Sequence, residues 1–140
     1  MPVAVSYHCL APNAPLNLPV PAKSFLAMVV VREDVSDEWR SAVSDWLVAA
    51  GCLYMCAWGL DCTLWDDSVD CANLAQFSYG DIPEDRFVMT TWHADVPLEE
   101  AVWFAKHSAR HDVVTLDASM IIDVSLIDHA DEMLRLWTDS

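Results

Sequence analysis

Short apolar segments that are each followed by a helix-start signal most constrain how this chain can fold. In the clearest case, an apolar run over 87–92 gives way to a polar turn and then to Pro97 and Glu99, residue types common in the first turn of a helix. The run over 25–31 is continuously apolar and ends in β-branched residues, which is typical of a strand covered on both faces. Each transition therefore predicts a buried strand that leads into a helix.

Four such units follow one another after residue 24. Strands are expected near 25–31, 52–58, 87–92 and 113–123, each with a helix after it. The best specified helix lies between Ser36, a good N-cap, and Gly51, a C-terminal stop. Right-handed crossovers turn this alternation into a parallel sheet with helices on both faces. We predict one three-layer α/β sandwich, flavodoxin-like or abbreviated Rossmann-like, with a mainly parallel four-stranded sheet in the order 2-1-3-4.

Residues 1–23 have a different composition from the α/β domain predicted over 24–140. They hold five prolines and almost no charge: Pro2, Pro12, Pro15, Pro19 and Pro21. Proline fixes φ and lacks a backbone donor, so this segment is expected to be an extended arm or irregular loop. We expect it to pack on the domain through Leu10, Leu16, Leu18 and Val20. The alternative is an arm exchanged with a partner, which leaves a homo-oligomer open.

The charge balance narrows the classes of partner. The chain has 22 acidic and 7 basic residues, which gives a formal net charge of −15. Such a field repels nucleic-acid phosphates and anionic membranes, so both are excluded as partners. It favours a basic protein surface, a cationic small molecule or a metal ion.

The cysteines and the first residues bear on the compartment. The five cysteines are an odd number without a Cys-x-x-Cys pair, which argues against a disulfide framework and a zinc knuckle. Residues 1–9 carry no positively charged, apolar leader, and no apolar run approaches the length of a membrane span. A reducing cytoplasm is the expected location.

Acidic residues and one histidine are predicted at the carboxyl ends of the strands, where ligands usually bind in open α/β sheets. Candidate binding residues in these turns are Glu33, Asp34, Asp61, His93 and Asp95. Carboxylates beside an imidazole can hold Mg²⁺ or Ca²⁺ or share acid and base roles. Asp61, His93 and Asp95 are therefore the candidate metal ligands, although no cofactor is required by the sequence.

Asp66 and Asp67 are further candidates at the start of the second helix. Thr63 and Asp66 have the spacing of a capping box, so a purely structural role as helix-start acids is the stronger interpretation for Asp66. Both aspartates are expected near the same edge of the sheet, at the carboxyl ends of the strands, which we call the rim.

Three tryptophans are expected around that rim, namely Trp58, Trp65 and Trp92. Aromatic faces beside carboxylates can bind a cation, and aromatic anchors within an acidic surface can equally form a protein-recognition hot spot. The sequence does not choose between these two roles.

Familiar catalytic devices are missing from the sequence. Only three glycines occur, so neither a dinucleotide fingerprint nor a phosphate-binding P-loop is present. A receiver domain would need a lysine after its last strand, and the only lysines are Lys23 and Lys106. A reactive thiolate would need an electropositive pocket, whereas this chain is acidic.

Three short segments resemble a bacterial domain family of unknown function. They are Trp46-Leu-Val-Ala-Ala-Gly-Cys-Leu-Tyr54, Trp65-Asp-Asp-Ser68 and Thr91-Trp-His93, and the resemblance covers residues 25–125 approximately. It implies a bacterial origin and brings no catalytic residues.

Two functions follow as hypotheses. The leading one is a small, acidic, non-enzymatic interaction module of the immunity, inhibitor or regulatory type that binds a basic protein partner. The alternative is an enzyme or ligand-binding domain with an acidic, divalent-metal site at the carboxyl ends of the strands. A concave pocket in which the candidate acids converge would favour the alternative.

Overall fold

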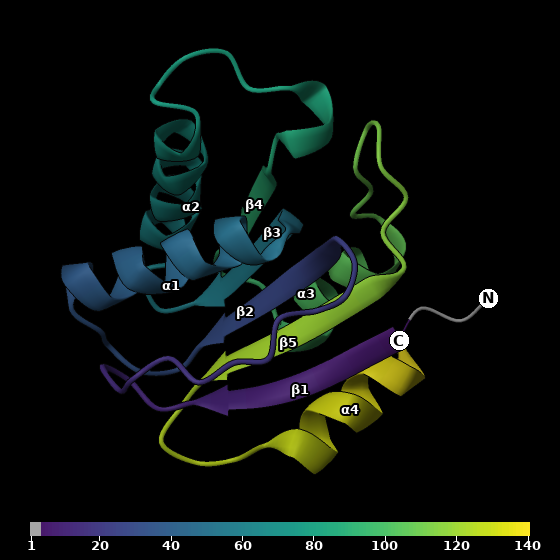
Figure 1. Cartoon of the computed structure of the whole chain (residues 1–140). Helices are drawn as coiled ribbons and strands as arrows, with labels where there is room; N and C mark the ends of the chain where they lie inside the picture. Colours follow the sequence, from purple (N-terminus) through teal and green to yellow (C-terminus); the bar gives the residue numbers. More distant parts are fainter. Residues whose placement is uncertain (1–3) are drawn as a thin grey trace.

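Five parallel strands form one sheet in the order β1-β5-β2-β3-β4 in the computed structural model, which describes residues 4–140 (Figure 1). The strands are β1 (Ala4–Leu10), β2 (Phe25–Val31), β3 (Cys52–Gly59), β4 (Met89–His93) and β5 (Ala118–Val124). Each neighbouring pair is parallel. The predicted α/β class, flavodoxin- or Rossmann-like, is confirmed.

Helices cover both faces of the sheet (Figure 1). They are α1 (Asp37–Ala50), α2 (Cys62–Gln76), α3 (Leu98–His107) and α4 (Ala130–Asp139), with a short 3₁₀ helix, η1 (Glu84–Arg86), before β4. The side chains of β2 alternate between two cores: Phe25 packs with residues of α1 and α2, and Leu26 with residues of α3 and α4. Within residues 4–140, no helix is both long and apolar enough to cross a membrane.

The predicted strand order 2-1-3-4 is wrong. The prediction placed β2 between β3 and β4. In the structure β3 lies between β2 and β4, and β5 pairs with the other side of β2. The connection through α3 therefore carries the chain from β4 past β3 and β2. Apolar patterning identifies a strand, but it does not determine how far a crossover carries the chain across the sheet.

The expected N-terminal arm contributes a fifth strand, so four strands was too few. β1 pairs with β5 along its whole length, from Ala4 beside Ala118 to Leu10 beside Val124. The prolines at 12, 15, 19 and 21 lie in the connection to β2, where no ladder needs their N–H groups, and Pro2 lies outside the described residues. Two leucines of this connection, Leu16 and Leu18, pack against the core beneath α1, whereas Val20 is exposed.

Local signals placed α1 correctly and the later strands less accurately. The Ser36 hydroxyl oxygen accepts from the backbone N–H of Trp39 at 3.1 Å, and Gly51 ends the helix with a left-handed φ of 104°. β4 begins at residue 89 rather than 87, and β5 occupies 118–124 rather than 113–123. The segment 111–117 is a loop, in which the ring of His111 accepts hydrogen bonds from two following backbone N–H groups.

Candidate functional site

The predicted rim residues follow three adjacent strands. Glu33 and Asp34 come after β2, Asp61 comes after β3, and His93 ends β4 with Asp95 two residues further on. Since β2, β3 and β4 are neighbours and parallel, all these turns lie at one end of the sheet. The structure therefore brings the turns to the same edge.

The three candidate metal ligands at that edge do not form a ligand cluster. Within residues 4–140, the one group of three acidic, histidine or cysteine residues whose ligand atoms come within 4.8 Å of one another lies elsewhere, on α2. Asp61 and Asp95 are exposed and left-handed, with φ of 53° and 60°. The His93 ring packs 4.7 Å from that of Phe104 and shares a 3.0 Å hydrogen bond with Thr91, so it belongs to the packing on the α3 face. Burial lowers the pKa of His93, which favours its neutral form.

The three candidate tryptophans have different environments. Trp65 is fully buried and meets Trp39 edge to face at 6.3 Å, so it is a core residue. Trp58 is half-buried, and its indole N–H donates to the carbonyl of Val96 at 2.8 Å. Trp92, by contrast, is 53% exposed. Of these three tryptophans, Trp92 alone presents a large aromatic surface to solvent.

The capping box predicted for Thr63 and Asp66 does not form. α2 starts at Cys62 after the left-handed Asp61, and no side chain caps its first turn. Asp66 therefore lies beyond the first turn and is buried, with 6% of its surface exposed. Its carboxylate therefore faces the protein interior and is not exposed at the rim.

A polar network that the sequence did not identify joins β1, β2 and β5. The fully buried Asp123 of β5 accepts from the Arg32 guanidinium at 2.9 Å and from the Tyr7 hydroxyl at 2.5 Å. The Tyr7 oxygen in turn accepts from the backbone N–H of His129. Burial and the Asp123 carboxylate raise the pKa of Tyr7, which keeps its hydroxyl protonated. The one available signal was an aspartate inside the apolar strand Ala118–Val124.

This network lies where the connections leaving β2 and β5 diverge to opposite faces, the place where ligands often bind in such sheets. Both carboxylate oxygens of Asp123 are already hydrogen-bonded to side chains. The arrangement therefore ties three strand ends together and leaves no free acidic group for a ligand.

The outer edge of β4 is the open side of the sheet near the acidic residues. β4 pairs only with β3, and among residues 4–140 no backbone hydrogen bond from another segment reaches residues 89–93. The chain just before the strand is fixed: the Asn73 side chain accepts from the Val88 N–H at 2.9 Å and donates to the Arg86 carbonyl. His111 also binds the Phe87 carbonyl, at 2.7 Å. The open edge thus begins at Met89 on a rigid support.

Pockets flank this edge on both faces of the sheet. On the α2 side lies a mainly apolar pocket of about 410 Å³, lined by Asp70, Asn73, Leu74, Ile82, Phe87, Val88, Met89 and Thr90. On the α3 side lies a pocket of about 350 Å³, lined by Glu84, Phe87, Met89, His111, Asp112 and Val113. Each pocket therefore combines apolar side chains of the β4 segment with at least one carboxylate.

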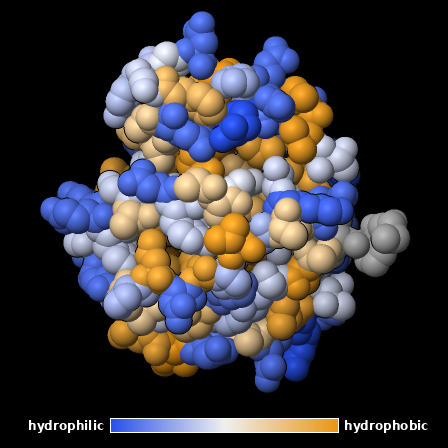
Figure 2. All heavy atoms as spheres, in the orientation of Figure 1, coloured by the Kyte–Doolittle hydropathy of each residue, from blue (hydrophilic) through white to orange (hydrophobic). Residues whose placement is uncertain are grey.

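The surface carries hydrophobic side chains in separate patches. On the face with α1 and α2, orange patches alternate with blue ones, and one patch overlies the loop before β5 (Figure 2). That loop carries Val113, which is 54% exposed, and the edge segment carries Phe87, which is 49% exposed. Exposed apolar groups thus flank β4 within an acidic surface.

The cysteines are all free, and they differ in accessibility. Cys9 and Cys71 are exposed, while Cys52, Cys56 and Cys62 are buried. Burial raises the pKa of Cys52 and of Cys56 to about 12, and burial together with Asp123 raises the pKa of Cys9. None of these environments activates a thiolate.

We expect a thiol reagent at neutral pH to label Cys71 first and Cys9 more slowly. The three buried thiols should react only after unfolding, because the fold restricts access to them. Mass spectrometry of peptides after timed labelling measures this order. Rapid labelling of Cys56 in the native protein would contradict the packing described for β3.

The parallel sheet with two helical layers places the protein in the flavodoxin- or Rossmann-like class of α/β proteins. The chain belongs to the DUF7684 family, a domain of unknown function, whose family model matches residues 5–140. The expected membership of a domain family of unknown function is confirmed, and the match extends beyond residues 25–125. No curated protein and no solved structure matches the chain.

Proposed function

We propose that this protein is a non-enzymatic acidic module that binds a basic, extended segment of a partner protein along the outer edge of β4. An immunity protein, inhibitor or regulatory subunit of a bacterial cytoplasmic system would bind in this way. The observation that carries the proposal is an open edge strand with a pocket on each face and carboxylates in both.

Strand addition explains why both pockets lie beside the same strand. An added strand gains main-chain hydrogen bonds from the open edge, and its side chains alternate between the two faces of the sheet. Alternate side chains would therefore enter the pocket beside α2 and the pocket beside residues 111–113. This geometry selects an extended segment rather than a helix.

The distribution of charge defines the sequence of that segment. The α2-side pocket is the more apolar of the two, with Leu74 and Ile82 in its wall, and it suits aliphatic side chains. The opposite pocket has Glu84 and Asp112 at its boundary, and it suits lysine or arginine. A segment that alternates aliphatic and basic residues is complementary to both, and the net charge of −15 attracts it from a distance.

The other sheet edge fits this partner less well. β1 is also an edge strand, but residues 4–10 contain no acidic or basic side chain apart from His8. Strand addition there would gain backbone hydrogen bonds without charge complementarity. The acids near β4 thus distinguish one edge from the other.

A synthetic peptide that alternates lysine and valine tests the proposal. We expect it to bind with an affinity that falls as salt is added, since exposed charges are screened over about 10 Å at 0.1 M. Hydrogen exchange at the backbone amides of 89–93 should slow when it binds. Calorimetry and exchange mass spectrometry, both in EDTA, measure these effects.

Two charge-matched double variants localise the binding. The double variant Glu84→Lys with Asp112→Lys should lower the affinity for the peptide by about tenfold, because two exposed ion pairs of up to about 1 kcal/mol each are lost. Glu38→Lys with Asp131→Lys changes the net charge equally at exposed helix starts elsewhere, and it should weaken the peptide less.

A peptide of the same sequence with alternate backbone amides N-methylated separates strand addition from simple charge attraction. It keeps every lysine but cannot complete a ladder, and we expect it to bind markedly less well. Equal binding of the methylated peptide would overturn the proposal. So would absence of binding by the parent peptide, since the acids near β4 would then serve only to keep an open edge from aggregating.

A further inference from the structure

We propose that Asp66, Asp67 and Asp70 on α2 form a binding site for a hard divalent cation, Mg²⁺ or Ca²⁺. The site uses none of the predicted ligands Asp61, His93 and Asp95. It goes beyond the proposed partner binding and differs from it in ligand, although Asp70 also lines the α2-side pocket.

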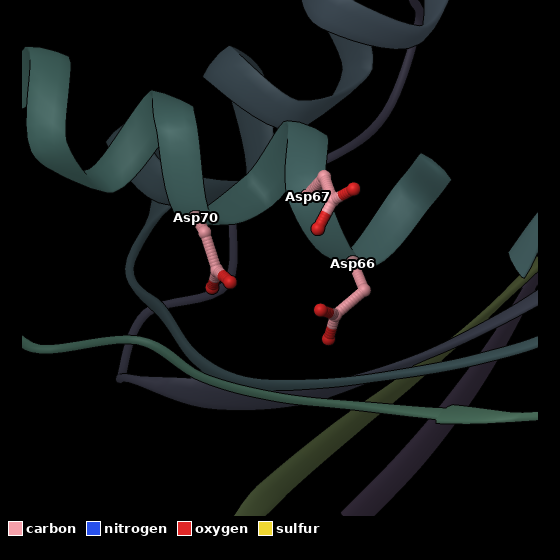
Figure 3. Close-up of side chains that lie close together, drawn as sticks. All are labelled: Asp66, Asp67 and Asp70. Carbon is pink, nitrogen blue, oxygen red and sulfur yellow. The ribbon is translucent and has the colours of Figure 1, made fainter. Parts of the chain in front are cut away.

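The three carboxylates are brought together by one helix. Asp70 lies four residues after Asp66 and three after Asp67, so both are its neighbours on the surface of α2. One oxygen of each carboxylate lies within 4.8 Å of the others. Figure 3 shows the carboxylates of Asp66 and Asp70 turned toward one another, with that of Asp67 above the gap between them. Oxygens at this separation can share one cation, because Ca²⁺ and Mg²⁺ bind oxygen at about 2.0–2.6 Å.

The environment of Asp66 distinguishes this group from an ordinary acidic surface. Only 6% of Asp66 is exposed, and its Oδ1 is fully buried without a hydrogen-bond partner in the part of the chain that the structure describes. The other unpartnered buried atoms, Arg40 Nε and Trp65 Nε1, are donors. A buried carboxylate oxygen without a donor or counter-ion is unfavourable, and a bound cation would satisfy it.

Within the described residues, no side-chain cation forms an ion pair with these carboxylates. Among residues 4–140, the ion pairs are Arg32 with Asp123, Arg40 with Asp37 and His129 with Glu132, and none includes the three aspartates of α2. Burial, together with the smaller effect of the charges of Asp66 and Asp67, raises the pKa of Asp70. Mutual repulsion of this kind is relieved when a cation binds.

A hydrogen bond from the neighbouring strand orients Asp70. Its Oδ1 accepts from the Thr90 hydroxyl of β4 at 2.9 Å, which leaves Oδ2 for a ligand. Asp67 is exposed, so water can complete the coordination. A site that offers only oxygen ligands and is open to water on one side suits Mg²⁺ or Ca²⁺. Zn²⁺ favours nitrogen and sulfur ligands instead.

Calorimetric titration of the full chain with MgCl₂ and with CaCl₂ tests the proposal. We expect one saturable site per chain, with a dissociation constant on the order of 0.1–1 mM, as for open carboxylate sites. The cation should also raise the melting temperature above that in NaCl of equal ionic strength.

Asp66→Asn should reduce the affinity at least tenfold and abolish the thermal shift. In EDTA this variant should melt at or above the wild-type temperature, because it removes a buried unpaired charge. Asp131→Asn, an exposed acid on α4, is the matched control and should leave binding unchanged. If Asp66→Asn fails to fold, Asp70→Asn provides the same test of affinity.

Two results would overturn the site: no saturable binding of either cation to the wild type, or equal binding by wild type and the Asp66→Asn variant. Because the peptide experiment is run in EDTA and this one without peptide, failure of one proposal leaves the other standing.

Discussion

Replacing Asp123 by alanine is expected to lower the free energy of unfolding by about 3–5 kcal/mol. The substitution removes a fully buried carboxylate that accepts from Arg32 and Tyr7, and it leaves both donors without their partner. The loss is large because an uncompensated, partly buried guanidinium remains, and because β5 loses its side-chain hydrogen bonds to Tyr7 of β1 and to Arg32 after β2. Urea denaturation followed by circular dichroism measures the change.

Asp37→Ala provides the matched control, since Asp37 also binds an arginine. Its carboxylate accepts from Arg40 at 2.8 Å, but its side chain is 89% exposed. Exposed ion pairs and first-turn acids each contribute at most about 1 kcal/mol, so this variant should be much less destabilised. Equal losses in the two variants would show that the Asp123 network does not stabilise the strand ends.

Gly59→Ala is expected to be the second severe substitution, with a loss of more than about 3 kcal/mol. Gly59 ends β3 with φ of 104°, and a Cβ atom there would lie 2.1 Å from the backbone oxygen of Val31. That oxygen also accepts from the N–H of Leu60 at 2.9 Å, so β2 cannot move away without breaking the contact between the two strand ends. Backbone strain and a main-chain clash therefore add.

Gly51→Ala separates these two effects. Gly51 has the same φ of 104°, but the nearest atom to an added Cβ is the Ser24 Cα at 3.8 Å. This variant should show only the left-handed backbone penalty, about 1–2 kcal/mol. Denaturation midpoints of both variants, measured together, give the comparison. A Gly51→Ala loss as large as that of Gly59→Ala would mean that the clash with Val31 is relieved by movement of the chain.

Local sequence was sufficient for the elements whose signals lie within a few residues. Ser36 caps α1, Gly51 ends it, and the apolar runs of β2 and β3 lie where they were predicted. These features depend on backbone conformation and on burial of both faces, which a short segment encodes by itself. The parallel α/β class follows from their alternation.

Composition averaged over a long segment concealed β1. The prolines of the first 23 residues indicated an arm, but those within the described chain lie after Leu10, in the connection to β2. The short stretch Ala4–Leu10 forms a strand because it pairs with the edge of β5 that β2 does not occupy, more than a hundred residues later in the chain. No local pattern contains that partner.

The candidate sites show the same division. The sequence placed carboxylates in the turns after β2, β3 and β4, and its acidity indicated a cationic partner or ion. Which carboxylates meet depended on how α2 packs on the sheet, since Asp66 is buried beside Asp70 on that helix. The exposure of Trp92 and the two pockets beside β4 depended on β4 being an edge strand.

The alternation of strands and helices, the N-cap and C-terminal glycine of α1 and the negative net charge can be predicted from the amino-acid order, because they depend on residues close together in the chain or on total charge. The strand order, the pairing of β1 with β5, the burial of Asp123 beside Arg32 and Tyr7, and the grouping of the three aspartates on α2 are seen only in the folded protein. These contacts join segments distant in sequence or depend on how a whole helix packs, so they form only when the complete sheet and its two helical layers come together.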